Sequence, residues 1–196
     1  MTAATTTNAK SVDTSDFAHG GHSYHAFPGG GFLKTTKMGT IKNVVWGRFY
    51  VHMKPGAPGG HGEIVGVYDT SGDWYEIGWQ FNGILGNWHG LGGEKPLRSM
   101  PYIVDKWYCI EFLFDGAAGV MPQWWIDGSE AQYYMAVPAA KGPRMETQFT
   151  HLEVGMTSFA GLGLNQQPYG NSNPPVMTDL WIDDVAFDTQ RIGCIE

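Results

Sequence analysis

Hydrophobic and polar residues alternate with a period of two along several short segments, a pattern that predicts β-strands with one buried face. The clearest run covers residues 44–53, where Phe49, Val51 and Met53 mark an apolar face. The opposite face carries an indole, a guanidinium, a phenol and an imidazole in a row: Trp46, Arg48, Tyr50 and His52. These groups can stack on a sugar, hold a carboxylate and move a proton, so this strand is a candidate site.

Similar runs recur at short intervals, separated by Gly, Pro, Asn and Asp turn signals, and no amphipathic helix or internal repeat interrupts them. The predicted strands are residues 22–27, 31–36, 44–53, 61–68, 74–82, 106–114, 123–127, 151–158 and 180–187. Their shared period predicts a two-sheet antiparallel sandwich. The residues expected between the sheets are Phe49, Val51, Tyr75, Ile77, Trp79, Ile110 and Phe112.

Length and local composition predict one domain. The segment 1–11 is rich in Thr and Ala and is expected to be a linker or expression remnant, with a single β-domain over 12–196. Two Gly-, Asn- and Pro-rich segments, 83–101 and 160–178, are longer than ordinary hairpin loops and are expected to wall a groove.

The composition narrows the possible partners. The chain has 28 Gly, 11 Pro and 14% aromatic residues, which suits short strands and tight turns. A formal net charge of −7 disfavours nucleic acid and anionic membranes, and no apolar run reaches the roughly 20 residues needed to span a bilayer. Many aromatic residues combined with few charges favour a carbohydrate partner, and we expect a monomer.

The two cysteines, Cys109 and Cys194, leave two possibilities open. A disulfide would tie the chain end to a central strand, as is typical of an oxidising compartment. Two free thiols remain the alternative, because the sequence does not measure their separation.

Other strands add polar and aromatic groups. In residues 74–82, Trp74, Glu76 and Gln80 share the face opposite the apolar stripe. Glu111 is expected either to face a groove or to be paired, because an unpaired buried charge is costly. The adjacent Trp124 and Trp125 send one ring to each face, so one is core and the other is a possible stacking platform.

Five segments together resemble a known family. They are AHGGHSYH at 18–25, WGRFY at 46–50, WYCIE at 107–111, WWIDG at 124–128 and LWIDDV at 180–185. The chain is similar to concanavalin A-like lectin and glucanase jelly rolls, and within them to the polysaccharide-lyase-like group of glucuronan lyases and a cellulose-induced fungal protein. The resemblance implies an all-β, two-sheet antiparallel β-jelly roll with a concave groove, in a secreted protein.

The resemblance also implies a site and a metal. In that group the ligand lies on the concave face of one sheet, which would bring Arg48, Tyr50, His52 and Gln80 together here. A calcium ion commonly joins the first and last strands. Carried onto this chain, the implied ligands are Asp184 with an early carboxylate, Asp13 or Asp16.

The leading hypothesis is a polysaccharide lyase that cleaves a uronic-acid polysaccharide by β-elimination without an organic cofactor. Arg48 and Gln80 would hold the carboxylate, His52 or His61 would take the C5 proton, and Tyr50 would return a proton to the glycosidic oxygen. Sugar contacts are expected from a wider set of residues: Trp46, Trp74, Glu76, His61, Trp125 and Glu111.

Two alternatives stay open. A noncatalytic carbohydrate-binding module would use Trp46, Trp74 and Trp125 as stacking surfaces. A glycoside hydrolase would place two carboxylates around a glycosidic bond, chosen from Glu63, Glu76 and Glu111. The triplet His19, His22 and His25 also suggests a transition-metal site, although scaffold histidines are the more common outcome.

Overall fold

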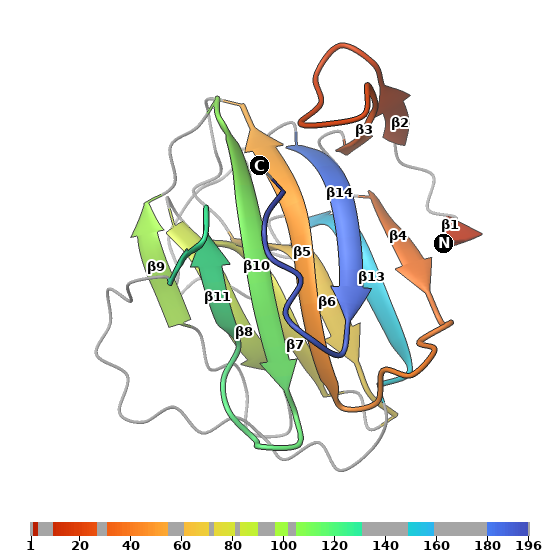
Figure 1. The fold of residues 1–196 in the computed structure, drawn as a ribbon, viewed down its shortest axis with the longest axis vertical. Helices are drawn as coiled ribbons and strands as arrows, with labels where there is room; N and C mark the ends of the chain where they lie inside the picture. Colours follow the sequence, from red (N-terminus) through yellow and green to blue (C-terminus); the bar gives the residue numbers. More distant parts are fainter. Residues whose placement is uncertain are drawn as a thin grey trace.

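Two β-sheets lie face to face and make up the fold (Figure 1). The structure is a computed structural model, and it describes residues 2–3, 10–26, 31–54, 61–70, 73–80, 83–89, 97–101, 105–130, 149–158 and 180–195. Within these ranges all strand pairs are antiparallel. This arrangement confirms the prediction of an all-β, two-sheet jelly roll.

The sheet that we call sheet A lies behind in Figure 1 and has the strand order β1-β4-β13-β6-β7-β8-β9. Its strands are β1 (Thr2–Ala3), β4 (Gly31–Thr35), β6 (His61–Tyr68), β7 (Trp74–Gln80), β8 (Gly83–His89), β9 (Leu97–Pro101) and β13 (His151–Ser158). Sheet B lies in front and has the order β12-β11-β10-β5-β14-β3-β2. Its strands are β2 (Lys10–Asp13), β3 (Ser23–Ala26), β5 (Val44–Met53), β10 (Trp107–Asp115), β11 (Gln123–Ile126), β12 (Ser129–Glu130) and β14 (Leu180–Asp188).

The core lies between the two sheets. Of the residues expected there, six are fully or almost fully buried: Phe49, Val51, Tyr75, Ile77, Ile110 and Phe112. The side chain of Trp79 lies outside the described part of the chain. Two glycines permit close packing of large rings, because a Cβ at Gly47 would overlap the ring of Phe112 and one at Gly86 would overlap the ring of Trp124.

Most predicted strands are confirmed to within two residues, and the main error is in residues 83–101. That segment was expected to be a loop, but β8 and β9 lie within it. Glycine and asparagine are rare in strands, so the composition pointed away from them. The segment 160–178 lies outside the described residues. Lys10 and Ser11, expected to lie in a linker, pair with β3.

Candidate functional site

The outer face of sheet B carries the row of polar side chains that the alternation in residues 44–53 predicts. Alternation places Phe49, Val51 and Met53 in the core, as expected. Arg48, Tyr50 and His52 lie on the other side of the strand, yet they too are buried, with no more than 9% of each residue exposed. The chain itself covers this face, because the C-terminal residues 189–195 run across β10 and β5 (Figure 1). We call residues 189–195 the strap.

Hydrogen bonds to the strap's backbone occupy the middle of this row. Arg48 donates through Nη1 to the carbonyl of Gly193 at 3.0 Å. The hydroxyl of Tyr50 donates to the carbonyl of Ile195 and accepts from its amide, both at 2.7 Å. These polar groups hold the chain end against the sheet, so they do not face a ligand.

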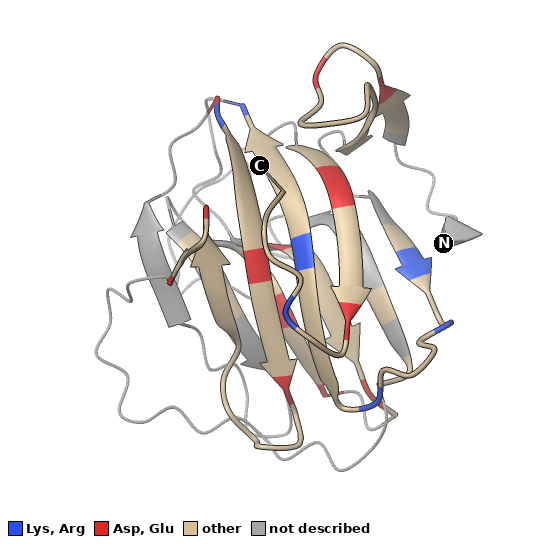
Figure 2. Cartoon of the chain, viewed as in Figure 1, with Lys and Arg blue, Asp and Glu red and all other residues tan. Residues whose placement is uncertain are grey.

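An ion pair and a disulfide hold the rest of the strap. Arg191 donates through Nε and Nη2 to the two oxygens of Glu111, at 2.8 and 3.1 Å, and these bonds raise the pKa of the guanidinium. The same guanidinium lies 4.4 Å from the ring centre of Trp125, which stacks on Trp46. Figure 2 shows an acidic position on β10, a basic one on β5 and an acidic one on β14.

Cys194 forms a disulfide with Cys109, which resolves the alternatives that the sequence left open. The paired alternative for Glu111 is likewise confirmed. For the tryptophan pair, Trp124 is in the core and Trp125 lies on the outer face.

The loop after β2 occupies the far end of the same face. His52 lies between two carboxylates, with Nδ1 2.8 Å from Asp16 and Nε2 3.3 Å from Asp105. Asp16 also accepts a hydrogen bond from the indole of Trp107, at 2.9 Å. His52 therefore contributes to holding the loop on the sheet.

The carboxylates expected to bind calcium have other partners. The indole N–H of Trp181 and the hydroxyl of Ser15 donate to Asp13 and hold its pKa well below the usual range. Asp184 lies 2.7 Å from Nδ1 of His19. Among the residues that the structure describes, no group of three or more His, Cys, Asp or Glu could hold a metal ion. Calcium binding near these residues stays a prediction.

The expectation that four polar residues share one groove is wrong. Arg48, Tyr50 and His52 are on β5 in sheet B, whereas Gln80 ends β7 in sheet A, so the sandwich separates them. Gln80 is instead paired with His61 of β6. The side chains of Gln80 and His61 lie outside the described part of the chain.

The outer face of sheet A carries a different cluster: Glu63, Tyr68, Trp74 and Glu76. Val65 and Val67 of β6 are in the core, so Gly66 and Tyr68 belong to the outer face. Gly66 is paired directly with Glu76, and Tyr68 with Trp74. The rings of Tyr68 and Trp74 stack at 5.7 Å.

A β-bulge brings Glu63 to this face. The register between β6 and β7 shifts by one residue between Glu63 and Val65. A strict two-residue period would put Glu63 on the core side with Val65, whereas the extra residue reverses its direction. Its carboxylate lies over Gly66, since a Cβ there would overlap Oε1. Glu63 thus lies next to Glu76 on the neighbouring strand.

The Tyr68 hydroxyl donates a hydrogen bond to the Glu63 carboxylate, and its oxygen lies 2.7 Å from Oε2 and 3.0 Å from Oε1. Glu76 accepts a longer bond from the Trp74 indole, at 3.4 Å. Glu63 is 4% exposed and Glu76 is 0% exposed. A buried carboxylate bonded to a phenol can exchange a proton, and the Trp74 ring beside it suits stacking on a sugar.

Sequence reasoning found only part of this cluster. Trp74 and Glu76 were assigned to sugar binding from their shared face, and Glu63 appeared only in the hydrolase alternative. Tyr68 was missed because it ends its strand next to a turn, and the residue two positions before it in the strand is Gly66. The signal that could have found it is the pairing across the 68–74 hairpin, which places two aromatic rings opposite each other.

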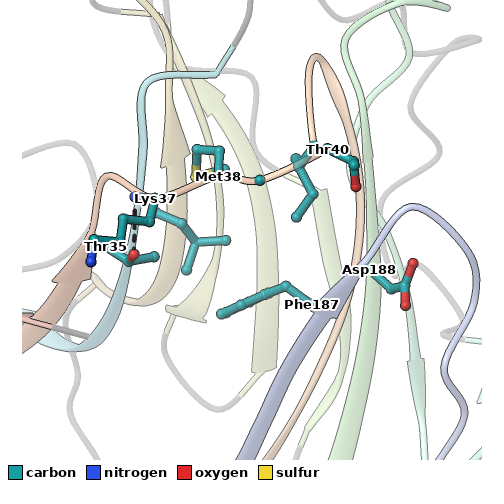
Figure 3. A pocket seen from close by; sticks show the side chains of 9 residues that line it. Thr35, Lys37, Met38, Thr40, Phe187 and Asp188 are labelled. Atoms are coloured by element: carbon teal, nitrogen blue, oxygen red, sulfur yellow. Dashed lines mark hydrogen bonds between the residues drawn. The ribbon is translucent and has the colours of Figure 1, made fainter.

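A separate pocket of about 410 Å³ opens near the end of β14. Figure 3 shows Met38 and Phe187 directed into it, with Lys37 and Asp188 on opposite sides. Asp188 already accepts hydrogen bonds from the amide and hydroxyl of Thr189. The lining contains no pair of acidic side chains, so this pocket offers less chemistry than the sheet A cluster.

Comparisons with solved structures agree with the architecture. The cellulose induced protein Cip1 matches with a TM-score of 0.67 and 17% identity, over 95% of this chain and 88% of that one. An endo-β-1,4-glucuronan lyase from the fungus Trichoderma reesei matches with a TM-score of 0.67 and 11% identity, over 94% and 88%. The binding domain of botulinum neurotoxin DC in complex with SialylT matches at 0.59 and 11%, over 94% and 42%.

The chain therefore has the concanavalin A-like jelly-roll fold. Its likeness to Cip1 and to the glucuronan lyase spans nearly all of it. No protein-family model matches the sequence, and no curated protein matches it. Nowhere in the described ranges does a helix have the length and apolar character needed to cross a membrane.

Proposed function

We propose that this protein binds and acts on a polysaccharide at the outer face of sheet A. The observation that carries the proposal is the buried hydrogen bond between Tyr68 and Glu63, beside Glu76 on the next strand. Trp74 supplies an aromatic surface on the same face. Two of the solved structures with this fold are, by name, a glucuronan lyase and a cellulose-induced protein, which supports a carbohydrate ligand.

The leading reaction is β-elimination on a uronic-acid polysaccharide. A base removes the C5 proton, the bond between C4 and the glycosidic oxygen breaks, and that oxygen receives a proton. Tyr68 is our candidate for both proton transfers. With its hydroxyl proton held by Glu63, the phenolate takes the C5 proton and passes it to the glycosidic oxygen, and Glu63 then returns the proton that it held. His61 and Gln80 are paired with each other further along the same two strands.

Hydrolysis is the second candidate, and the specific observation that favours it is the adjacency of two buried carboxylates. Glu63 lies over Gly66, and Gly66 is paired with Glu76. In glycosidases one carboxyl protonates the leaving oxygen while the other attacks or activates water. The two reactions give different products from the same site.

We also propose that the protein works in an oxidising, extracellular setting. The Cys109–Cys194 disulfide supports this location, since disulfides persist mainly outside the reducing cytosol. The formal charge of −7 disfavours nucleic acid as the partner.

The test is a product assay on polyuronates and neutral glucans that records both unsaturated-product absorbance and new reducing ends. Elimination gives both signals and hydrolysis gives reducing ends alone. Retention on the polymer with neither signal identifies a binding module. If there is no product and no retention on any polymer, the proposal is wrong.

Matched variants locate the activity. Glu63→Gln and Glu76→Gln keep the side-chain size but remove the charge, and either should reduce turnover by about 10²-fold or more. Glu111→Gln is the control, because Glu111 is an equally buried carboxylate on the other sheet, bonded to Arg191. Equal losses in all three variants would indicate a general folding defect instead of a site on sheet A.

A further inference from the structure

The strap is bound to sheet B as a peptide is bound by a receptor. Two side chains of the sheet, Arg48 and Tyr50, contact its backbone. Its one charged side chain, Arg191, lies between the Glu111 carboxylate and the Trp125 ring, with Trp46 stacked on Trp125. A carboxylate that takes both prongs of the guanidinium, together with an aromatic face, is a specific recognition element for arginine.

The disulfide is the only covalent bond that holds the described part of the strap in place beyond its connection to β14. The strap forms no strand, so each ordered residue loses backbone entropy without the return of a full hydrogen-bond ladder. Arg191 remains partly accessible, with 44% of its side chain exposed. The disulfide keeps the strap close to the sheet and so raises the local concentration at which its noncovalent contacts act.

We propose that the strap is a thiol-sensitive cover. Reduction of the Cys109–Cys194 bond releases it and uncovers an arginine-binding face made by Glu111, Trp125, Trp46, Arg48 and Tyr50. A dithiol reductant supplies two electrons and two protons, the sulfur–sulfur bond breaks, both cysteines become thiols, and the reductant becomes a disulfide. The uncovered face takes an extended peptide that carries an arginine, which is the chemistry of the strap itself.

The first test uses the full chain and trypsin, which cleaves after arginine. Protein is digested briefly with and without a dithiol, and cleavage after Arg191 is read by mass spectrometry after denaturation. Cleavage tracks the population of the open form, so the rate should rise at least about tenfold on reduction. An unchanged rate would overturn the proposal.

Two variants control for other causes of faster cleavage. The double variant Cys109→Ser/Cys194→Ser opens the strap without a reductant and should be cleaved as fast as reduced protein. A circular dichroism spectrum that stays β-rich shows that the sheets persist. Glu111→Gln with the disulfide intact should be cleaved faster than the unmodified oxidised chain even if the double variant does not fold.

The second test asks whether the uncovered face binds a peptide. The probe is a fluorescent synthetic peptide of residues 189–196 with Cys194→Ser. It should bind the reduced chain and not the oxidised chain, and an otherwise identical peptide with Arg191→Lys should bind about tenfold more weakly because lysine lacks the planar fork. Equal binding of both peptides, or of either peptide to both redox forms, would overturn the arginine-specific face.

Discussion

The outer faces of the two sheets both carry polar and aromatic side chains, but these groups have different partners. On sheet B, Arg48, Tyr50 and Glu111 bind residues of the strap. On sheet A, Glu63 and Tyr68 bind each other within one strand. The first face holds the strap, whereas the second carries a hydrogen-bonded tyrosine–glutamate pair that no strap residue contacts in the described structure.

The difference shows that residue chemistry alone does not identify a site. Tyr50 and Tyr68 are both phenols on outer faces, next to an aromatic or histidine ring. What separates them is the hydrogen-bond partner, which is a backbone amide and carbonyl for Tyr50 and a buried carboxylate for Tyr68. A backbone partner indicates a structural role, and a carboxylate partner permits proton transfer.

The two phenols make the largest predicted contrast. Removing the hydroxyl with Tyr68→Phe should lower turnover by about 10²–10⁴-fold, because a positioned proton-transfer group contributes that much to a transition state. Tyr50→Phe should leave turnover within about threefold and reduce stability by about 1 kcal/mol, the net value of a hydrogen bond. Steady-state kinetics and urea unfolding check both.

The contrast would be broken if Tyr50→Phe abolished turnover in a protein that binds the polymer normally. The original assignment of Tyr50 would then regain support, and the catalytic face would be on sheet B.

Alanine substitutions at two glycines, one beside each group of residues, test the same comparison between the two sheets. Gly47→Ala should cost about 1–3 kcal/mol of unfolding free energy, because the new methyl group overlaps the Phe112 ring in a closely packed core. Gly66→Ala should cost less, since the overlapping group is the end of a flexible side chain, the Glu63 carboxylate. It should instead lower turnover by moving that carboxylate away from Tyr68. Thermal unfolding and kinetics on both variants, measured together, separate the two effects.

Much of the fold follows from periodicity. Alternation along β5 and β7 placed Phe49, Val51, Tyr75 and Ile77 in the core because a strand with one buried face must alternate. Strands β8 and β9 were not predicted because the glycine-rich composition of residues 83–101 is typical of loops, although β8 pairs with β7 and β9 pairs with β8.

The candidate site was less predictable, for two physical reasons. A single-residue bulge reverses the direction of Glu63, and a local pattern does not reveal such an insertion. The burial of Arg48 and Tyr50 depends on a segment about 145 residues further along the chain. Alternation correctly gave their face but carried no information about what covers that face.

Ion pairs on sheet B should differ in strength according to burial. Arg191→Ala should destabilise the protein by about 1–2 kcal/mol, because it leaves the nearly buried Glu111 carboxylate without its paired donor. Lys106→Ala is the control, since the Lys106–Asp127 pair is about half exposed on both sides and should contribute under about 0.5 kcal/mol. Urea unfolding measures the two values. Equal losses of unfolding free energy would mean that the Arg191–Glu111 pair contributes no more than an exposed ion pair.

Calcium stays a prediction and should give the smallest effect. The resemblance implied a structural ion near Asp184 and either Asp13 or Asp16, but these carboxylates already bind His19, Trp181 and His52. Chelation should therefore lower the melting temperature by only a few degrees, less than reduction of the disulfide, because N–H donors continue to hold the loop when the ion leaves. Differential scanning calorimetry before and after chelation, with elemental analysis of the same sample, checks this. A large drop in melting temperature would mean that calcium, and not the hydrogen bonds to the loop, stabilises this end of sheet B. If no metal is bound and the melting temperature does not change, the calcium prediction is wrong.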